Sequence, residues 1–186
     1  MTRSSALAMV FALSSIVGCN SAYSAPLWRE DFETVCNGAP CGWAQVAGSP
    51  GAVTYVETLP SEHGVEMVGD GVAISRPGGG AVATSSTIST LQAHLVARCD
   101  PGASLTIIVS LTNLSGGPPI DVSGTAVLPP TWDGTRTRIT TFVPMDSTNA
   151  GAQFIGIVAV AIHKERSGVC EIDYLSLADG AVPFRE

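Results

Sequence analysis

Glycine and proline interrupt the chain every few residues, and β-branched residues fill the intervals between them. The sequence of 186 residues contains 20 Gly and 12 Pro, and this density disfavours long helices. Short β-branched segments between such residues are typical of strands joined by turns. The sequence therefore predicts an all-β protein: a single domain formed by an antiparallel two-sheet β-sandwich with jelly-roll connections.

Apolar and polar residues alternate in several of these segments, as in Leu105–Leu111, which indicates strands with one packed face. Phe154–Ile162 is apolar on both faces and is predicted to be a central strand covered on both sides. Segment 81–100 has neither Gly nor Pro, so a helix and a strand both fit it, and alternation from Leu91 to Cys99 favours the strand. The expected strands are Leu27–Glu33, Trp43–Val46, Ala52–Thr58, Val65–Val68, Gly71–Arg76, Ala81–Thr84, Leu91–Cys99, Ser104–Thr112, Ile120–Val127, Thr135–Val143, Gln153–His163 and Val169–Leu177.

The N-terminus has the pattern of an export signal. Arg3 precedes an apolar run that is shorter than the roughly 20 residues needed to span a bilayer. Ile16–Cys19 resembles a bacterial lipobox, so residues 1–18 are predicted to be removed and Cys19 to carry lipid. Ordinary secretion with cleavage after Ser24 is the alternative. The expected protein is thus an envelope lipoprotein, or is secreted or periplasmic, with no transmembrane helix. The predicted divisions are a 19–26 linker, a 27–178 domain and a 179–186 tail.

Five cysteines are an odd number for an exported protein, and lipid on Cys19 would leave four for two disulfides. Four cysteines allow three pairings. Cys36 and Cys41 bracket a turn sequence, which favours their pairing and leaves Cys99 with Cys170. In their expected strands, Cys99 shares the apolar face of Leu91–Cys99, and Cys170 shares a face with Ile172 and Tyr174. The alternative is that some of them remain buried thiols.

Charge and motifs exclude several classes of protein. The net charge is −7 and no basic face is visible, which disfavours nucleic-acid binding. The sequence contains no Gly-x-Ser-x-Gly nucleophile motif and no clustered histidines for a metal. The cysteine spacing fits no zinc site. The sequence thus favours a non-catalytic protein.

Four features resemble landmarks of the galactose-binding-like jelly rolls, a family that includes many carbohydrate-binding modules of secreted bacterial proteins. They are Asp31–Glu33 followed by Gly42–Trp43, Glu62–Met67 followed by Gly71–Ser75, Trp132 before a strand, and the closing strand Ile172–Leu177. The resemblance extends from residue 27 to residue 178. The chain differs at Tyr174, where the family commonly has a second aspartate, and it has few aromatic residues.

The resemblance implies a structural Ca²⁺ held by Glu33 near the chain start and Asp173 in the last strand, with Asp31 as a further ligand. Hard oxygen ligands of this kind suit Ca²⁺. If the first and last strands are neighbours, these carboxylates need a neutralising partner. Arg29 is the alternative to the metal, because a guanidinium can bridge carboxylates.

The resemblance also implies a carbohydrate site, in which Trp43, Tyr55 or Trp132 would stack on a sugar ring. Core packing is the alternative for each ring. The predicted function is an exported, non-catalytic β-sandwich that binds carbohydrate or another extracellular ligand, such as a glycan or a cell-envelope polymer. The alternatives are a structural or adhesion protein of the envelope without a small ligand, and a carbohydrate-active lyase or hydrolase.

Overall fold

The described part of the chain is built of β-strands alone. The computed structural model describes residues 26–59, 62–80, 91–113, 117–127, 137–144 and 154–179. No helix suited to crossing a membrane occurs in these residues. The strands are β1 (Trp28–Glu30), β2 (Val35–Cys36), β3 (Ala39–Pro40), β4 (Ala44–Ala47), β5 (Val53–Leu59), β6 (Glu62–Val68), β7 (Val72–Gly80), β8 (Leu91–Cys99), β9 (Ser104–Asn113), β10 (Ile120–Val127), β11 (Thr137–Pro144), β12 (Phe154–Glu165) and β13 (Val169–Asp179).

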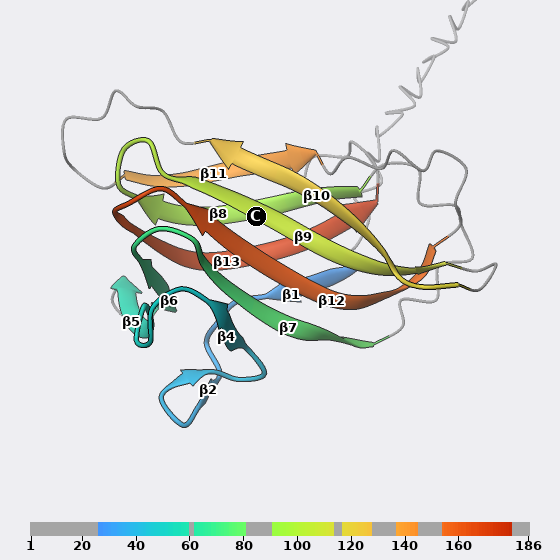
Figure 1. Cartoon of the computed structure of the whole chain (residues 1–186), viewed down its shortest axis with the longest axis horizontal. Helices are drawn as coiled ribbons and strands as arrows, with labels where there is room; N and C mark the ends of the chain where they lie inside the picture. The colour runs from blue at the N-terminus through green and yellow to red at the C-terminus, as the bar shows by residue number, and fades with distance from the viewer. Residues whose placement is uncertain are drawn as a thin grey trace, which may run out of the picture.

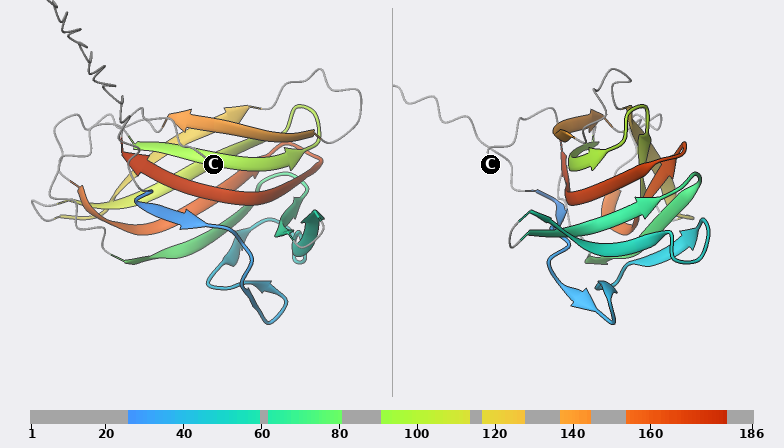
Figure 2. Two further views of the ribbon diagram at one scale, coloured as in Figure 1. Left: turned by 180° about the vertical axis from the view of Figure 1, so that it is seen from behind. Right: turned by 90° about the vertical axis from the view of Figure 1, so that its left-hand side faces the viewer.

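The strands form two large antiparallel sheets that pack face to face. One sheet, here the β13 sheet, has the order β11-β8-β13-β6-β5 with β1 beside β13. The other, the β12 sheet, has the order β10-β9-β12-β7-β4. The β12 sheet lies in front in Figure 1, and the β13 sheet lies in front when the molecule is turned round in Figure 2. The predicted all-β, antiparallel two-sheet β-sandwich is confirmed.

The core lies between the sheets and is made by the inward positions of alternating strands. Leu95 of β8 and Ile107 of β9 are fully buried there, as are many apolar residues of both sheets. The preference for a strand over a helix at Leu91–Cys99 is confirmed. β12 is central in its sheet, as predicted, but the expectation that both its faces are covered is wrong. Val158 is 41% exposed, whereas Val160 is buried.

The long disulfide joins paired positions of neighbouring strands inside the core. Cys99 of β8 lies opposite Cys170 of β13, both are fully buried, and their sulfurs are bonded. A register shift between Ile172 and Tyr174 then reverses the faces of β13. Leu175 is therefore buried in the core. The expectation that Tyr174 shares the face of Cys170 is wrong, because the bulge places it on the outer face.

A small hairpin made of β2 and β3 projects from the sandwich near β4 (Figure 1). Cys36 of β2 and Cys41, the residue after β3, form a disulfide within this hairpin, so both predicted disulfides are present. Two disulfides fit a protein that matures in an oxidising compartment. The predicted C-terminal tail begins one residue later than expected, because β13 includes Asp179. The predicted signal peptide, Cys19, the strand at Ala81–Thr84 and residues 180–186 lie outside the described residues and stay predictions.

Candidate functional site

The first strand ends early because the backbone turns sharply at Phe32. The sequence predicts a strand over Leu27–Glu33, but β1 stops at Glu30, and Phe32 has a φ of 57°. A bulky residue adopts this left-handed conformation only when its surroundings hold it there. The peptide N–H of Phe32 donates to Oε1 of Glu30 at 2.9 Å, and the Phe32 ring is fully buried. The turn thus anchors the ring in the core and carries the chain across the sheet edge.

The Glu30 carboxylate is the centre of this turn. It is only 8% exposed, yet it accepts hydrogen bonds from Phe32 and from Nε1 of Trp43, the latter at 3.1 Å. It also forms an ion pair with Arg76 of β7. Gly42 makes room for this partner, because a Cβ at Gly42 would lie 3.2 Å from Nε of Arg76. One buried carboxylate therefore ties together β1, the segment after the hairpin, and β7.

An open polar pocket of about 250 Å³ lies beside Glu30. We name it the Arg29 pocket. Its lining residues are Arg29, Glu30, Asp31, Thr34, Cys41 and Arg76. Arg29 and Asp31 are exposed, and the guanidinium of Arg29 has no hydrogen bond or ion pair with any residue in the described part of the chain. The pocket therefore offers guanidinium donors and carboxylate acceptors to a ligand.

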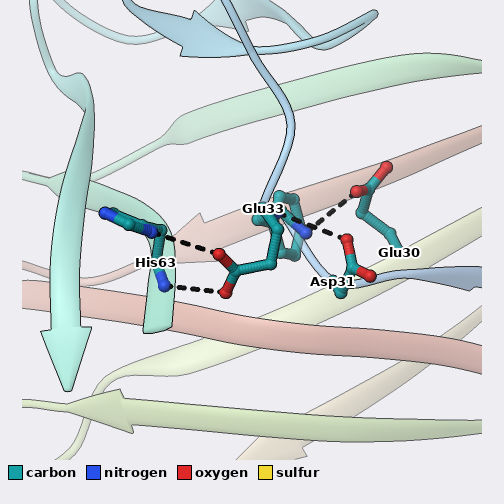
Figure 3. A network of polar contacts seen from close by, with 5 residues as sticks. Glu30, Asp31, Glu33 and His63 are labelled. Carbon is teal, nitrogen blue, oxygen red and sulfur yellow. Dashed lines mark hydrogen bonds and ion pairs between the residues drawn. The ribbon is translucent and has the colours of Figure 1, made fainter. Parts of the chain in front are cut away.

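A second polar cluster lies next to this pocket, on the far side of the Phe32 turn. Figure 3 shows the Glu33 carboxylate directed at His63. The peptide N–H of His63 donates to Oε1 of Glu33 at 2.8 Å, and Nδ1 of the His63 ring lies 3.1 Å from Oε2 of Glu33. The His63 ring stacks on Tyr55 with ring centroids 4.9 Å apart. The peptide N–H of Glu33 donates to Asp31 at 3.3 Å. These contacts fix the chain after the turn against β5 and β6.

The contacts with His63 make the contribution of Glu33 to the stability of the fold depend on pH. The hydrogen bond from the His63 backbone, with help from its side chain, lowers the pKa of Glu33 from its ordinary value of 4.5, although partial desolvation opposes this. A carboxyl with a lowered folded-state pKa stabilises the fold fully above its unfolded pKa and loses that contribution as the pH falls through the folded pKa.

We therefore expect wild type to melt at a higher temperature than Glu33→Gln at pH 6, and the difference to shrink as the pH is lowered below 4.5. Thermal unfolding of both proteins across this range measures it, and all other titrating groups are common to the pair. A difference that stays constant from pH 6 to pH 3 would contradict the prediction.

Comparison with solved structures identifies the fold. No family model and no curated protein sequence matches the chain. A family 11 carbohydrate-binding module from Clostridium thermocellum, solved with a β-1,3-1,4-mixed-linked tetrasaccharide, superposes with a TM-score of 0.52 at 12% identity. The match covers 81% of this chain and 94% of that module. The CBM22-1–GH10 modules of endo-1,4-β-D-xylanase 10B from the same organism, complexed with xylohexaose, give a TM-score of 0.53 at 11% identity.

The second match covers 86% of this chain but 29% of the xylanase modules, so it concerns one part of them. The chain has the β-sandwich fold of these carbohydrate-binding modules. The predicted resemblance to galactose-binding-like jelly rolls is confirmed at the level of the fold. At identities this low, a shared fold does not transfer a binding site, so the site must be judged from this chain's own residues.

The three aromatic residues predicted to stack on a sugar have different positions. Trp43 is 8% exposed, its ring centroid lies 5.4 Å from that of Phe32, and its indole nitrogen bonds Glu30. The structure thus places Trp43 in the core, which corrects the expectation of a sugar platform. Tyr55 is half-buried and its ring is stacked with His63. Trp132 lies outside the described residues.

The residues predicted to bind calcium meet other partners. Both carboxylate oxygens of Glu33 contact His63, so His63, and not Arg29, is the partner of this group in the described residues. Asp173 lies at the bulge of β13 and is 8% exposed. Nowhere in the described residues do three His, Cys, Asp or Glu side chains gather as a metal would require. The predicted ligands do not form a fitting set there, and calcium binding stays a prediction.

Sequence reasoning missed the roles of Glu30, Arg76 and His63. One signal was present for Glu30, since alternation along β1 puts it on the inward side with Trp28. No local pattern marked Arg76 or His63, because each meets its carboxylate across a gap of at least 30 residues.

A buried lysine was also missed. Lys164 of β12 is fully buried, and its ammonium donates to the carbonyl oxygens of Gly69 and Arg166, the second at 2.7 Å. Burial lowers the pKa of Lys164, and the charges of Asp70 and Asp100 partly oppose this. Lys164 thus connects the turn at Gly69 with the turn at Arg166 through hydrogen bonds to main-chain carbonyl oxygens.

Proposed function

We propose that this protein binds carbohydrate without catalysis and that the Arg29 pocket is the binding site. The observation that carries the proposal is the arrangement of the pocket. Arg29 and Asp31 are exposed in its lining, next to the buried Glu30. The Glu30 carboxylate is held in place by its contacts with Phe32, Trp43 and Arg76. A polyhydroxylated ligand needs both donors and acceptors, and a guanidinium beside a carboxylate supplies both.

The fold supports this proposal. A rigid β-sandwich positions binding residues without an ordering cost when the ligand arrives. The Cys36–Cys41 disulfide fixes the hairpin base at the rim of the pocket, since Cys41 itself is a lining residue. The two compared structures with this fold were solved with a tetrasaccharide and with xylohexaose. A glycan or cell-envelope polymer is the proposed partner, reached by a protein that is exported through residues 1–18 and held by lipid on Cys19.

The proposal predicts a specific loss of binding in one variant. Isothermal titration or affinity electrophoresis of the exported protein against a panel of neutral glycans and cell-wall polymers should detect binding. Arg29→Gln should weaken it about tenfold or more, because a hydrogen bond to a charged group contributes about 1.5–3 kcal/mol.

Arg166→Gln is the matched control. It removes the same charge from an exposed arginine that does not line the pocket, so it should bind like wild type. Equal weakening by both variants would show a general charge effect and would overturn the assignment of the site. Release of reducing sugar during incubation would contradict the non-catalytic assignment.

A further inference from the structure

The Arg29 pocket is small for a ligand site. Its volume of about 250 Å³ is below the roughly 300–1,000 Å³ of ordinary small-molecule pockets. Since a water molecule's share of liquid volume is ~30 Å³, and a sugar ring with its hydroxyls has the bulk of several waters, this space accommodates one sugar unit. An internal stretch of a polysaccharide needs a groove several units long.

Three separate segments supply the walls of the pocket. β1 and the residue after it contribute Arg29, Glu30 and Asp31, the hairpin contributes Thr34 and Cys41 at its base, and β7 contributes Arg76. The Cys36–Cys41 disulfide and the Glu30–Arg76 ion pair brace two of these walls. A pocket walled by braced segments cannot readily widen into a longer groove.

The charges of the lining residues balance. Two guanidinium groups face two carboxylates, and Glu30 already neutralises Arg76. The remaining pair, Arg29 and Asp31, are both exposed and both line the pocket. A carboxylate ligand would meet Asp31 as well as Arg29, whereas a ligand with neighbouring hydroxyls can donate to Asp31 and accept from Arg29.

None of the aromatic rings in the described residues lines the pocket. Trp43, the nearest one in the Glu30 network, is buried with its indole N–H bonded to Glu30. The sugar is therefore held by hydrogen bonds to polar side chains, and further units of a chain that extend out of the pocket have no stacking surface among its lining residues.

We propose that the Arg29 pocket binds one neutral sugar unit at the end of a glycan chain. This inference rests on the proposed function and narrows its ligand from carbohydrate in general to the terminal unit of a neutral glycan. Recognition uses Arg29 as donor and Asp31 as acceptor for adjacent hydroxyl groups.

Titration calorimetry with chain-length series tests the proposal. The probes are glucose, galactose, mannose, xylose and arabinose, their linear oligomers of two to six units, and glucuronic and galacturonic acids as the acidic comparison. For the series that binds, we expect the dissociation constant to change less than about threefold from the disaccharide to the hexasaccharide. Polymer binding should follow the molar concentration of chain ends rather than mass. Arg29→Gln and Asp31→Asn should each weaken binding of the shortest ligand.

Each outcome has a distinct meaning. A gain of tenfold or more in affinity between two and six units, abolished by Arg29→Gln, would overturn terminal recognition and leave carbohydrate binding at this pocket intact. Preference for the uronic acids would overturn the neutral ligand. Binding that survives both variants unchanged would overturn the pocket as the site. No binding to any probe or polymer would remove the proposed function itself.

Discussion

Replacing both Cys99 and Cys170 with alanine is expected to lower the free energy of unfolding by at least about 4 kcal/mol. The two residues are 71 positions apart, and on the chain-entropy model a crosslink that closes a loop of this length restricts the unfolded chain by about that amount. Both side chains are fully buried between the sheets, so removal of the sulfurs also leaves unfilled space in the core, which adds to the loss.

The other disulfide provides a matched control. Cys36 and Cys41 are five positions apart at an exposed hairpin, and the same model gives about 2 kcal/mol for a loop of that size. Urea denaturation of the oxidised wild type and of the two double-alanine variants measures both effects. The core variant should unfold at a clearly lower urea concentration than the hairpin variant. Equal losses, or a larger loss for the hairpin, would contradict the argument.

The hairpin disulfide has a separate expected effect on binding because Cys41 lines the Arg29 pocket. The Cys36→Ala/Cys41→Ala variant should fold, but it should bind sugar less tightly than wild type because the pocket wall at position 41 is no longer crosslinked. Its role therefore differs from that of the core disulfide, which stabilises the sandwich and is not part of the pocket.

Most strands could be predicted from the sequence because alternation is a local property. The pattern Leu105–Leu111 identifies its own buried face, and the structure places those residues of β9 inward. Alternation also favoured a strand at β8, where a helix was the rival. The same logic failed at Tyr174 because β13 contains a bulge there. A bulge is an extra residue relative to the neighbouring strand, and the local sequence pattern holds no information about that neighbour.

The candidate site was harder to predict because its contacts are long-range. Asp31 and Glu33 were identified from a motif, but their surroundings depend on the left-handed turn at Phe32. That turn is held by Glu30, which in turn needs Trp43 and Arg76. No window of sequence spans these partners. Sugar stacking and core packing were both open for Trp43 because nothing local distinguishes a core tryptophan from an exposed one.

Two glutamates three residues apart differ sharply in what surrounds them. Glu30 is 8% exposed and accepts from Phe32, Trp43 and Arg76. The side chain of Glu33 is 42% exposed and accepts from His63. Replacing either by alanine removes the same formal charge from the same turn. The pair therefore separates the effect of burial from the effect of charge.

We expect Glu30→Ala to lower the free energy of unfolding by about 3 kcal/mol, since each buried donor left without an acceptor costs about 1–3 kcal/mol. The donors concerned are the peptide N–H of Phe32 and Nε1 of Trp43. Arg76 adds less, because its side chain is 34% exposed and water can solvate it. Glu33→Ala should cost less than about 1 kcal/mol at neutral pH, as for other exposed ion pairs.

Chemical denaturation at pH 7 measures these losses, and Glu30→Gln refines them. The glutamine keeps an oxygen for Phe32 but loses the charge that pairs with Arg76, so its loss should lie between those of wild type and Glu30→Ala. Because Glu30 holds Arg76 beside the pocket, sugar affinity should fall in the order wild type, Glu30→Gln, Glu30→Ala, while Glu33→Ala retains binding. If Glu33→Ala destabilised the fold as much as Glu30→Ala, charge rather than the buried hydrogen bonds would hold the turn. If Glu30→Ala bound sugar like wild type, the pocket would not depend on Glu30.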